Sequence, residues 1–113
     1  MTLTLLQVAA GGAAGAVARY LTGHAAVRLM GHGFPWGTFT VNVVGSFAMG
    51  VLVVALAEWS ATRIAPLLLT GMLGGFTTFS SFSLDAATLY ERGEVALAAA
   101  YVGGSVVLSL LAI

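Results

Sequence analysis

Cysteine is absent from this chain, and charged side chains are scarce, with four basic and four acidic residues among 113. Without cysteine, disulfide bonds and thiolate metal sites are excluded. A soluble domain carries about 25% charged residues, so a chain with 7% cannot cover a surface that faces water. The formal net charge of zero argues against nucleic acid as a partner, because that binding depends on a basic surface. These absences indicate a protein of the lipid bilayer.

Hydrophobic residues make up 59% of the chain and fall into runs that are separated by polar or aromatic residues. A membrane-spanning helix needs roughly 20 such residues, and the runs predict four spans in a single domain. The predicted spans cover residues of about 3–23, 37–57, 65–90 and 95–113. Trp36, Trp59 and Tyr90 fall at span ends, where membrane proteins concentrate aromatic side chains. The sequence therefore predicts an all-α, multi-pass membrane protein.

The few charges in the loops bear on the orientation of the chain. We expect the first loop to begin at about His24 and to contain Arg28. With four spans, Arg63 is the only basic side chain on the side of the two termini, and Arg28 and Arg92 lie on the other. This difference is too small for the positive-inside rule to fix the topology. Two alternatives therefore stay open. The chain inserts in both orientations, which permits an antiparallel homodimer, or it inserts in one fixed orientation.

Small residues recur at a spacing of four within the predicted spans. The pairs are Gly11 with Gly15, Gly71 with Gly75, and Ser46 with Gly50. Such pairs let helix backbones approach closely in a bilayer, where hydrophobicity does not drive association. One chain of this length is too short to enclose a wide aqueous route, so we expect it to associate.

Several polar residues lie within the predicted spans, and each has two interpretations. A central arginine costs about 2.5–3.5 kcal/mol on insertion scales, so Arg19 either reaches for the headgroups or attracts an anion to a vestibule. Asn42 forms an interhelical hydrogen bond, or it offers its amide N–H donors to an anion. Ser105 and Ser109 share a helix face, where they line a path or bond back to their own helix.

The segment GGFTTFSSFS, residues 74–83, interrupts the third apolar run with adjacent glycines, hydroxyl side chains and phenylalanines. We expect the helix to break there. Unsatisfied backbone groups are very costly in lipid, so a break persists only where it is buried in protein or lines a cavity. Exposed carbonyl oxygens suit a hard cation such as sodium. Phe79 and Phe82 share a helix face, and the positive edges of their rings either meet a small anion or fill the core.

The motifs GGAAGAVARY, GTFTVNVVGS and GGFTTFSSFS, in this order, resemble the CrcB/Fluc family of small bacterial fluoride channels over nearly the whole chain. The third motif is highly specific, whereas the other two are weak alone. The resemblance implies four transmembrane helices with a broken third helix, in an antiparallel, dual-topology homodimer of the bacterial inner membrane. It also implies two fluoride pores, a central structural sodium ion, and passive export of cytoplasmic fluoride that relieves fluoride toxicity.

By the same resemblance, Gly74 and Thr77 hold the sodium ion through their backbone carbonyls. The fluoride pore is lined by Arg19, Asn42, Phe79 and Phe82, with hydroxyl groups from Thr38, Ser81, Ser83 and Ser105. Asp85 stands where relatives have glutamate, and the role of this shorter carboxylate near a pore mouth is left open.

Other classes of function fit only parts of the sequence. A small proton-coupled multidrug or guanidinium exporter has about this length, but it needs a carboxylate within the membrane, commonly in the first span, and that span has none. A non-transporting assembly subunit would explain the glycine pairs and nothing else. An enzyme is not indicated, because His24 and His32 have no nucleophile or carboxylate cluster beside them.

Overall fold

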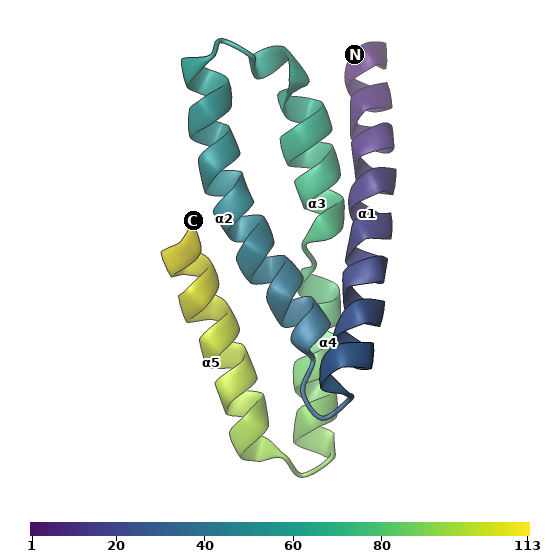
Figure 1. Ribbon diagram of the computed structural model, residues 1–113, viewed down its shortest axis with the longest axis vertical. Helices are drawn as coiled ribbons and strands as arrows, with labels where there is room; N and C mark the ends of the chain where they lie inside the picture. The colour runs from purple at the N-terminus through teal and green to yellow at the C-terminus, as the bar shows by residue number, and fades with distance from the viewer.

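The structure, a computed structural model, describes residues 1–113 as an all-helical chain (Figure 1). The three continuous helices are α1 (Thr2–Met30), α2 (Trp36–Glu58) and α5 (Val95–Ala112). Between α2 and α5 the elements are η1 (Thr62–Ile64), η2 (Pro66–Leu73), α3 (Gly74–Phe76) and α4 (Phe79–Glu91). Since η2, α3 and α4 follow one another along one path, they form a single bent helix. The expected four-helix architecture with a broken third helix is therefore confirmed.

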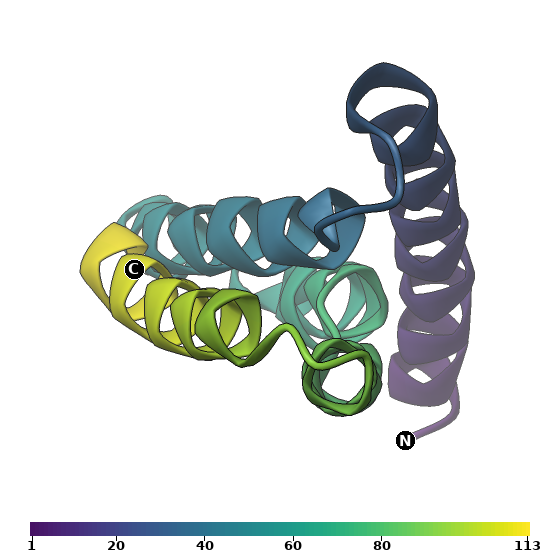
Figure 2. The same cartoon turned by 90° about the horizontal axis from the view of Figure 1, so that it is seen from below.

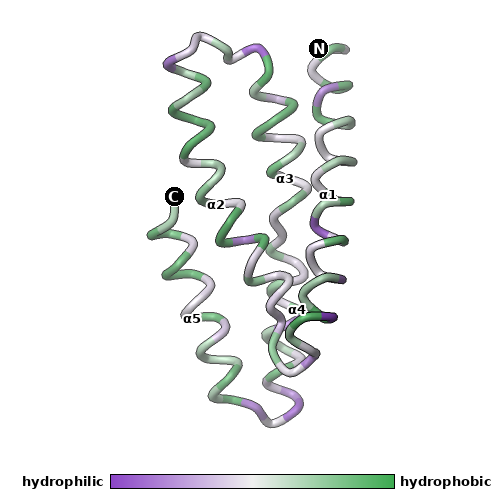
Figure 3. Tube along the Cα trace, viewed as in Figure 1, coloured by the Kyte–Doolittle hydropathy of each residue, from purple (hydrophilic) through white to green (hydrophobic).

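Three segments are long and apolar enough to cross a membrane, namely Trp36–Glu58, Thr62–Glu91 and Val95–Ala112. α1 is long enough, with 29 residues, but its many glycines and alanines and the polar Gln7 and Arg19 lower its hydropathy. Figure 3 shows hydrophobic residues along most of α2 and α5, and hydrophilic residues gathered mainly at the connections between helices. The chain is thus a multi-pass membrane protein, and a fourth span through α1 remains a prediction.

The first loop is shorter than the sequence suggests. α1 continues through His24 and Arg28 to Met30, and it ends at Gly31, whose φ of 78° lies in the left-handed region. Gly31 donates its N–H to the Val27 carbonyl, as glycine commonly does just after a helix. The expected loop start at His24 is wrong, because isolated polar residues are compatible with a helix and a left-handed glycine ends it.

α1 packs along the upper half of the bent helix through facing glycines. A Cβ atom on Gly11 would collide with the Leu67 carbonyl, and one on Gly15 would collide with the Met72 carbonyl. A Cβ on Gly75 would lie 2.6 Å from a carbonyl oxygen of α1. The predicted close approach at these glycine pairs is confirmed. Seen from below, α1 lies on one side of the bent helix and α5 on the other (Figure 2).

Few side chains are buried within the single chain. Only 13 of 113 residues are buried, and the one hydrophobic cluster contains Phe82, Leu89, Ala98 and Tyr101. Large apolar side chains along α1, α2 and α5 are exposed instead. Such a surface suits contact with lipid or with another protein and not with water.

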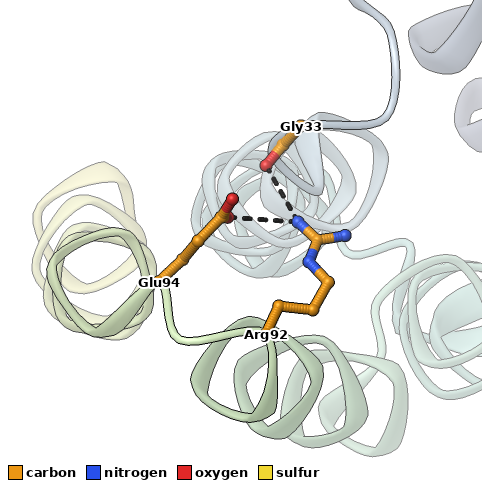
Figure 4. A network of polar contacts seen from close by, with 3 residues as sticks. All are labelled: Gly33, Arg92 and Glu94. Carbon is orange, nitrogen blue, oxygen red and sulfur yellow. Dashed lines mark hydrogen bonds and ion pairs between the residues drawn. The ribbon is translucent and has the colours of Figure 1, made fainter.

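Two connections meet at the lower end of the molecule (Figure 4). Arg92 Nη2 donates to Glu94 Oε2 at 3.1 Å and to the Gly33 carbonyl at 3.5 Å. These contacts tie the loop between α1 and α2 to the loop between α4 and α5. An exposed ion pair contributes only about 0–1 kcal/mol, so these contacts join the two loops only weakly.

Candidate functional site

The bent helix breaks at two threonines. Thr77 has φ −86° and ψ 158°, and Thr78 has φ −155° and ψ 126°. Gly74, by contrast, keeps helical angles of φ −62° and ψ −37°. β-Branched side chains fit extended backbone better than helix, whereas the glycines are needed for close contact with α1. The break predicted from the sequence is confirmed, with the glycines before it still helical.

The break removes helical partners from two carbonyl groups. In a continuous helix the Thr78 N–H would bond the Gly74 carbonyl, but it donates to Asn42 Oδ1 at 2.8 Å instead. The Ser81 N–H, which would bond the Thr77 carbonyl, donates to Thr78 Oγ1 at 3.2 Å. Both carbonyls predicted to hold a cation have thus lost their helical donors, and both residues line one cavity.

Asn42, on α2, satisfies the backbone of the break. Its Nδ2 donates to the Thr78 carbonyl at 3.0 Å, and its Oδ1 accepts the Thr78 N–H at 2.8 Å. One N–H of the Asn42 amide is used in this way, and the second is available to a ligand. The interhelical hydrogen bond expected from the sequence is confirmed. Since Asn42 also lines the cavity, this bond does not exclude a role toward an anion.

Arg19, on α1, contacts the bent helix just before the break. Its Nε donates to the Gly75 carbonyl at 3.0 Å in a partly buried setting. The guanidinium therefore points toward the protein and is not simply extended to the headgroups. A second cavity of about 380 Å³ is lined by Arg19 together with Thr38, Thr78 and Ser81. The remaining N–H donors of Arg19 give this cavity a positive end.

α2, the break and α5 line an open cavity of about 550 Å³. Its polar lining consists of Asn42, Ser46, Thr77, Thr78, Ser105 and Ser109. The hydroxyl groups of Ser105 and Ser109 are buried and have no hydrogen-bond partner. Back-bonding to their own helix, one of the two interpretations from the sequence, is therefore wrong. Each hydroxyl thus keeps a donor that no group of the protein uses, in a residue that lines the cavity.

Phe79 and Phe82 both line this cavity but differ in burial. Their ring centroids are 5.6 Å apart, with an angle of 47° between the planes. Phe82 is 9% exposed and contacts the Tyr101 ring at 5.2 Å, whereas Phe79 is 78% exposed. Phe82 therefore fills the core, as one interpretation of the sequence expected, and also lines the cavity. Phe79 projects from the open side of the chain.

The other predicted pore residues lie in different places. Thr38 and Ser81 line the cavity beside Arg19. The Ser83 hydroxyl donates to the Phe79 carbonyl at 3.0 Å on an exposed face of α4. Its hydrogen bond is local, and Ser83 lines neither the 550 Å³ cavity nor the cavity beside Arg19.

Asp85 has a partner that sequence reasoning missed. The Tyr101 hydroxyl donates to Asp85 Oδ2 at 3.2 Å, and Tyr101 is fully buried. Asp85 and Thr38 also line a third cavity, of about 270 Å³, at the lower end of the molecule. A tyrosine inside an apolar span needs a hydrogen-bond partner for its hydroxyl. The sequence could have indicated this pair, because the Tyr101 hydroxyl needed a partner and the Asp85 carboxylate had no assigned role.

Comparisons with known proteins agree with these features. Residues 6–113 match a family model described as "CrcB-like protein, Camphor Resistance (CrcB)". The chain is 69% identical over 110 residues to the fluoride-specific ion channel FluC of Cereibacter sphaeroides. This alignment covers 97% of this chain and 88% of the relative. The fluoride-specific ion channel FluC of Paracoccus denitrificans is 58% identical over 113 residues, which are 100% of this chain and 90% of the relative. The FluC channel of Agrobacterium fabrum is 50% identical over 113 residues, with 98% of this chain and 90% of the relative covered.

Proposed function

The chain belongs to the CrcB family, and on this premise we propose that it is a fluoride-specific ion channel that exports cytoplasmic fluoride passively across the bacterial inner membrane. The observation that carries the proposal is the cavity beside the helix break. Neutral donors line it, among them the amide of Asn42 and the hydroxyls of Ser105 and Ser109, which lack internal partners. The activity is transport and not an enzymatic reaction.

The lining suits a small, strongly hydrated anion. Fluoride holds its water tightly, so a pore must return comparable hydrogen bonds as that water is removed. Hydroxyl and amide donors supply them without a full positive charge, and conduction requires binding that is favourable at entry yet weak enough for exit. The edges of the Phe79 and Phe82 rings add mild attraction and narrow the path. Larger anions lose hydration there without gaining equal contacts.

Arg19 lines a cavity that shares Thr78 with the 550 Å³ cavity. With Thr38 and Ser81 it lines the neighbouring cavity, where its charge concentrates anions. No acidic side chain lines the 550 Å³ cavity. A proton-coupled exporter, which needs a carboxylate within the membrane, is therefore poorly supported.

We further propose that two copies form an antiparallel, dual-topology homodimer with two pores. The cavity of a single chain is open along one side, and Phe79 is 78% exposed there. A second copy would close the cavity and cover the ring. The weak charge bias of the loops permits insertion in both orientations.

A sodium ion fits the carbonyl groups at the break. Gly74 and Thr77 offer oxygen atoms that have lost their helical donors, and hard cations take oxygen ligands. Exposed carbonyls of an interrupted membrane helix commonly coordinate sodium. When bound between two copies, the ion would satisfy these oxygens and offset repulsion between the anions in the two pores.

The test is anion efflux from liposomes that contain the purified protein, with fluoride and chloride electrodes read in parallel. We expect rapid fluoride loss with chloride retained, in the absence of a proton or sodium gradient. Fluoride retention by a well-folded, reconstituted protein would contradict the proposal, as would loss of both anions at similar rates.

A further inference from the structure

A continuous series of aromatic rings links the first loop to the cavity. Trp36 contacts Phe34 with 4.5 Å between ring centroids, and Phe34 contacts Tyr101 at 5.4 Å. Tyr101 in turn contacts Phe82 at 5.2 Å, and Phe82 contacts Phe79 at 5.6 Å. The series begins outside the 550 Å³ cavity, which Phe34 and Trp36 do not line, and ends inside it.

Tyr101 is the central member of the series, and three contacts fix its ring. Its hydroxyl donates to Asp85, one side packs on Phe82, and the edge-on ring of Phe34, at an interplanar angle of 89°, packs on another. Edge-to-face geometry is a preferred arrangement of aromatic rings. Without Phe34, the Tyr101 ring would keep its hydrogen bond but lose the contact that sets its tilt. Phe82 packs directly on that ring.

Phe34 is itself held in place, although it lies in a loop. The Gly33 carbonyl, on the preceding residue, accepts a hydrogen bond from Arg92 at 3.5 Å (Figure 4). The Phe34 carbonyl accepts the Trp36 N–H at 2.8 Å. The side chain packs against the buried cluster that contains Phe82 and Tyr101. This packing on the cluster, more than the exposed contact at Gly33, holds the Phe34 ring beside Tyr101.

We propose that Phe34 is a positioning residue of the pore: by packing on Tyr101, it holds the Phe82 ring in the orientation that fluoride meets. This inference rests on the proposed function, because Phe82 matters only if the cavity conducts. Phe34 does not line the 550 Å³ cavity, although it lines the 270 Å³ cavity at the lower end together with Thr38 and Asp85. Its effect on Phe82 passes through the Tyr101 ring.

Phe39 provides a matched control. It is also a partly buried phenylalanine that packs against the same cluster, and it contacts the Phe34 ring at 6.0 Å and the Trp36 ring at 5.9 Å. No ring contact joins it to Tyr101 or Phe82. Truncation of Phe39 thus removes comparable apolar packing at the same end of the molecule without removing a member of the series.

The experiment compares fluoride efflux from liposomes for the wild type and the Phe34→Leu, Phe34→Tyr and Phe39→Leu variants. An aromatic pair contributes a free energy equivalent to a factor of about 2–12 in rate. We expect Phe34→Leu to slow efflux by about fivefold on this basis. Phe34→Tyr should restore most of the rate, and Phe39→Leu should stay within about twofold of the wild type.

A spectroscopic readout separates positioning from general packing. With 4-fluorophenylalanine at position 82, the ¹⁹F resonance should shift or split in the Phe34→Leu protein and stay at its original position in Phe39→Leu. An unchanged resonance, or efflux from Phe34→Leu equal to that of the wild type, would overturn the inference. Absence of fluoride efflux from the wild type itself would instead overturn the proposed function, so the two failures are distinguishable.

Discussion

Asn42 and Thr78 are joined by two hydrogen bonds, of 3.0 Å from Asn42 Nδ2 to the Thr78 carbonyl and 2.8 Å from the Thr78 N–H to Asn42 Oδ1. The side-chain amide thereby takes the place of the helical acceptor that the Thr78 N–H loses at the break, and it adds a donor to the Thr78 carbonyl. In lipid this substitution is essential, because an unsatisfied backbone group there costs several kcal/mol. One residue of α2 thus keeps the break stable and also lines the cavity.

Asn42→Ala should weaken both the fold and the flux. The substitution leaves the Thr78 N–H without a partner and removes one donor from the Thr78 carbonyl, and an unsatisfied buried group costs about 1–3 kcal/mol. We expect a lower midpoint of thermal unfolding in detergent and loss of fluoride efflux. A variant with wild-type stability would show that water or lipid satisfies Thr78 equally well, contrary to the structure.

Ser105→Ala should separate flux from stability. Ser105 is 4% exposed and its hydroxyl has no partner, so its removal breaks no internal hydrogen bond and should leave the thermal midpoint unchanged or raised. If the hydroxyl donates to the ion, loss of one such hydrogen bond, of about 1.4 kcal/mol, should slow efflux by about tenfold.

Thr88→Ala is the control for Ser105→Ala. The Thr88 hydroxyl donates to the Leu84 carbonyl at 2.8 Å within its own helix and is exposed. Its loss should leave efflux unchanged. Equal effects of the two substitutions on efflux would mean that Ser105 has no particular role in the path.

Gly15→Ala should destabilise the chain through the contact between α1 and the bent helix. The added Cβ would collide with the Met72 carbonyl, and backbone cannot move aside as a flexible side chain can. Overpacking of this kind costs about 1–3 kcal/mol. Gly103→Ala, where a Cβ meets nothing within 4 Å, should be neutral or slightly stabilising. Thermal unfolding of the purified variants tests this, and equal midpoints would refute the close approach.

Arg19→Gln should reduce fluoride efflux at low ionic strength by several-fold. The substitution removes the positive charge of the cavity lined with Thr38 and Ser81 and the donor to the Gly75 carbonyl. Because salt screens such attraction, with a Debye length of about 30 Å at 0.01 M and about 10 Å at 0.1 M, the deficit should shrink as ionic strength rises. Arg28→Gln, near the exposed end of α1, is the control. A deficit that is independent of salt would point to the Gly75 contact alone.

The sequence was sufficient for the features that depend on local patterns. Apolar runs predicted four helices, glycine spacing predicted the contact of Gly11 and Gly15, and GGFTTFSSFS predicted the break, because each follows from the physics of a single segment in lipid. The first loop was placed too early, since polar residues such as His24 are read as loop signals although only Gly31 ends the helix.

The pairings within the site depend on the fold and could not be read from one segment. Arg19 and Gly75 are 56 positions apart, and Asn42 and Thr78 are 36 apart. Nothing in the local sequence indicates that a guanidinium from the first helix reaches a carbonyl of the third. The hydrogen bond between Tyr101 and Asp85 was missed for the same reason, although each residue alone was unusual for an apolar span.

The bend at Thr77 and Thr78 divides the chain into two mechanical parts. Above it, η2 and α3 pack on α1; below it, α4 packs on α5. In the upper part, backbone atoms of α1 and the bent helix meet at glycines, where an added Cβ would collide. In the lower part, α4 presents the Phe79 and Phe82 side chains to the cavity. The glycine contacts with α1 and the cavity-facing side chains of α4 are thus set by different positions of one bent helix.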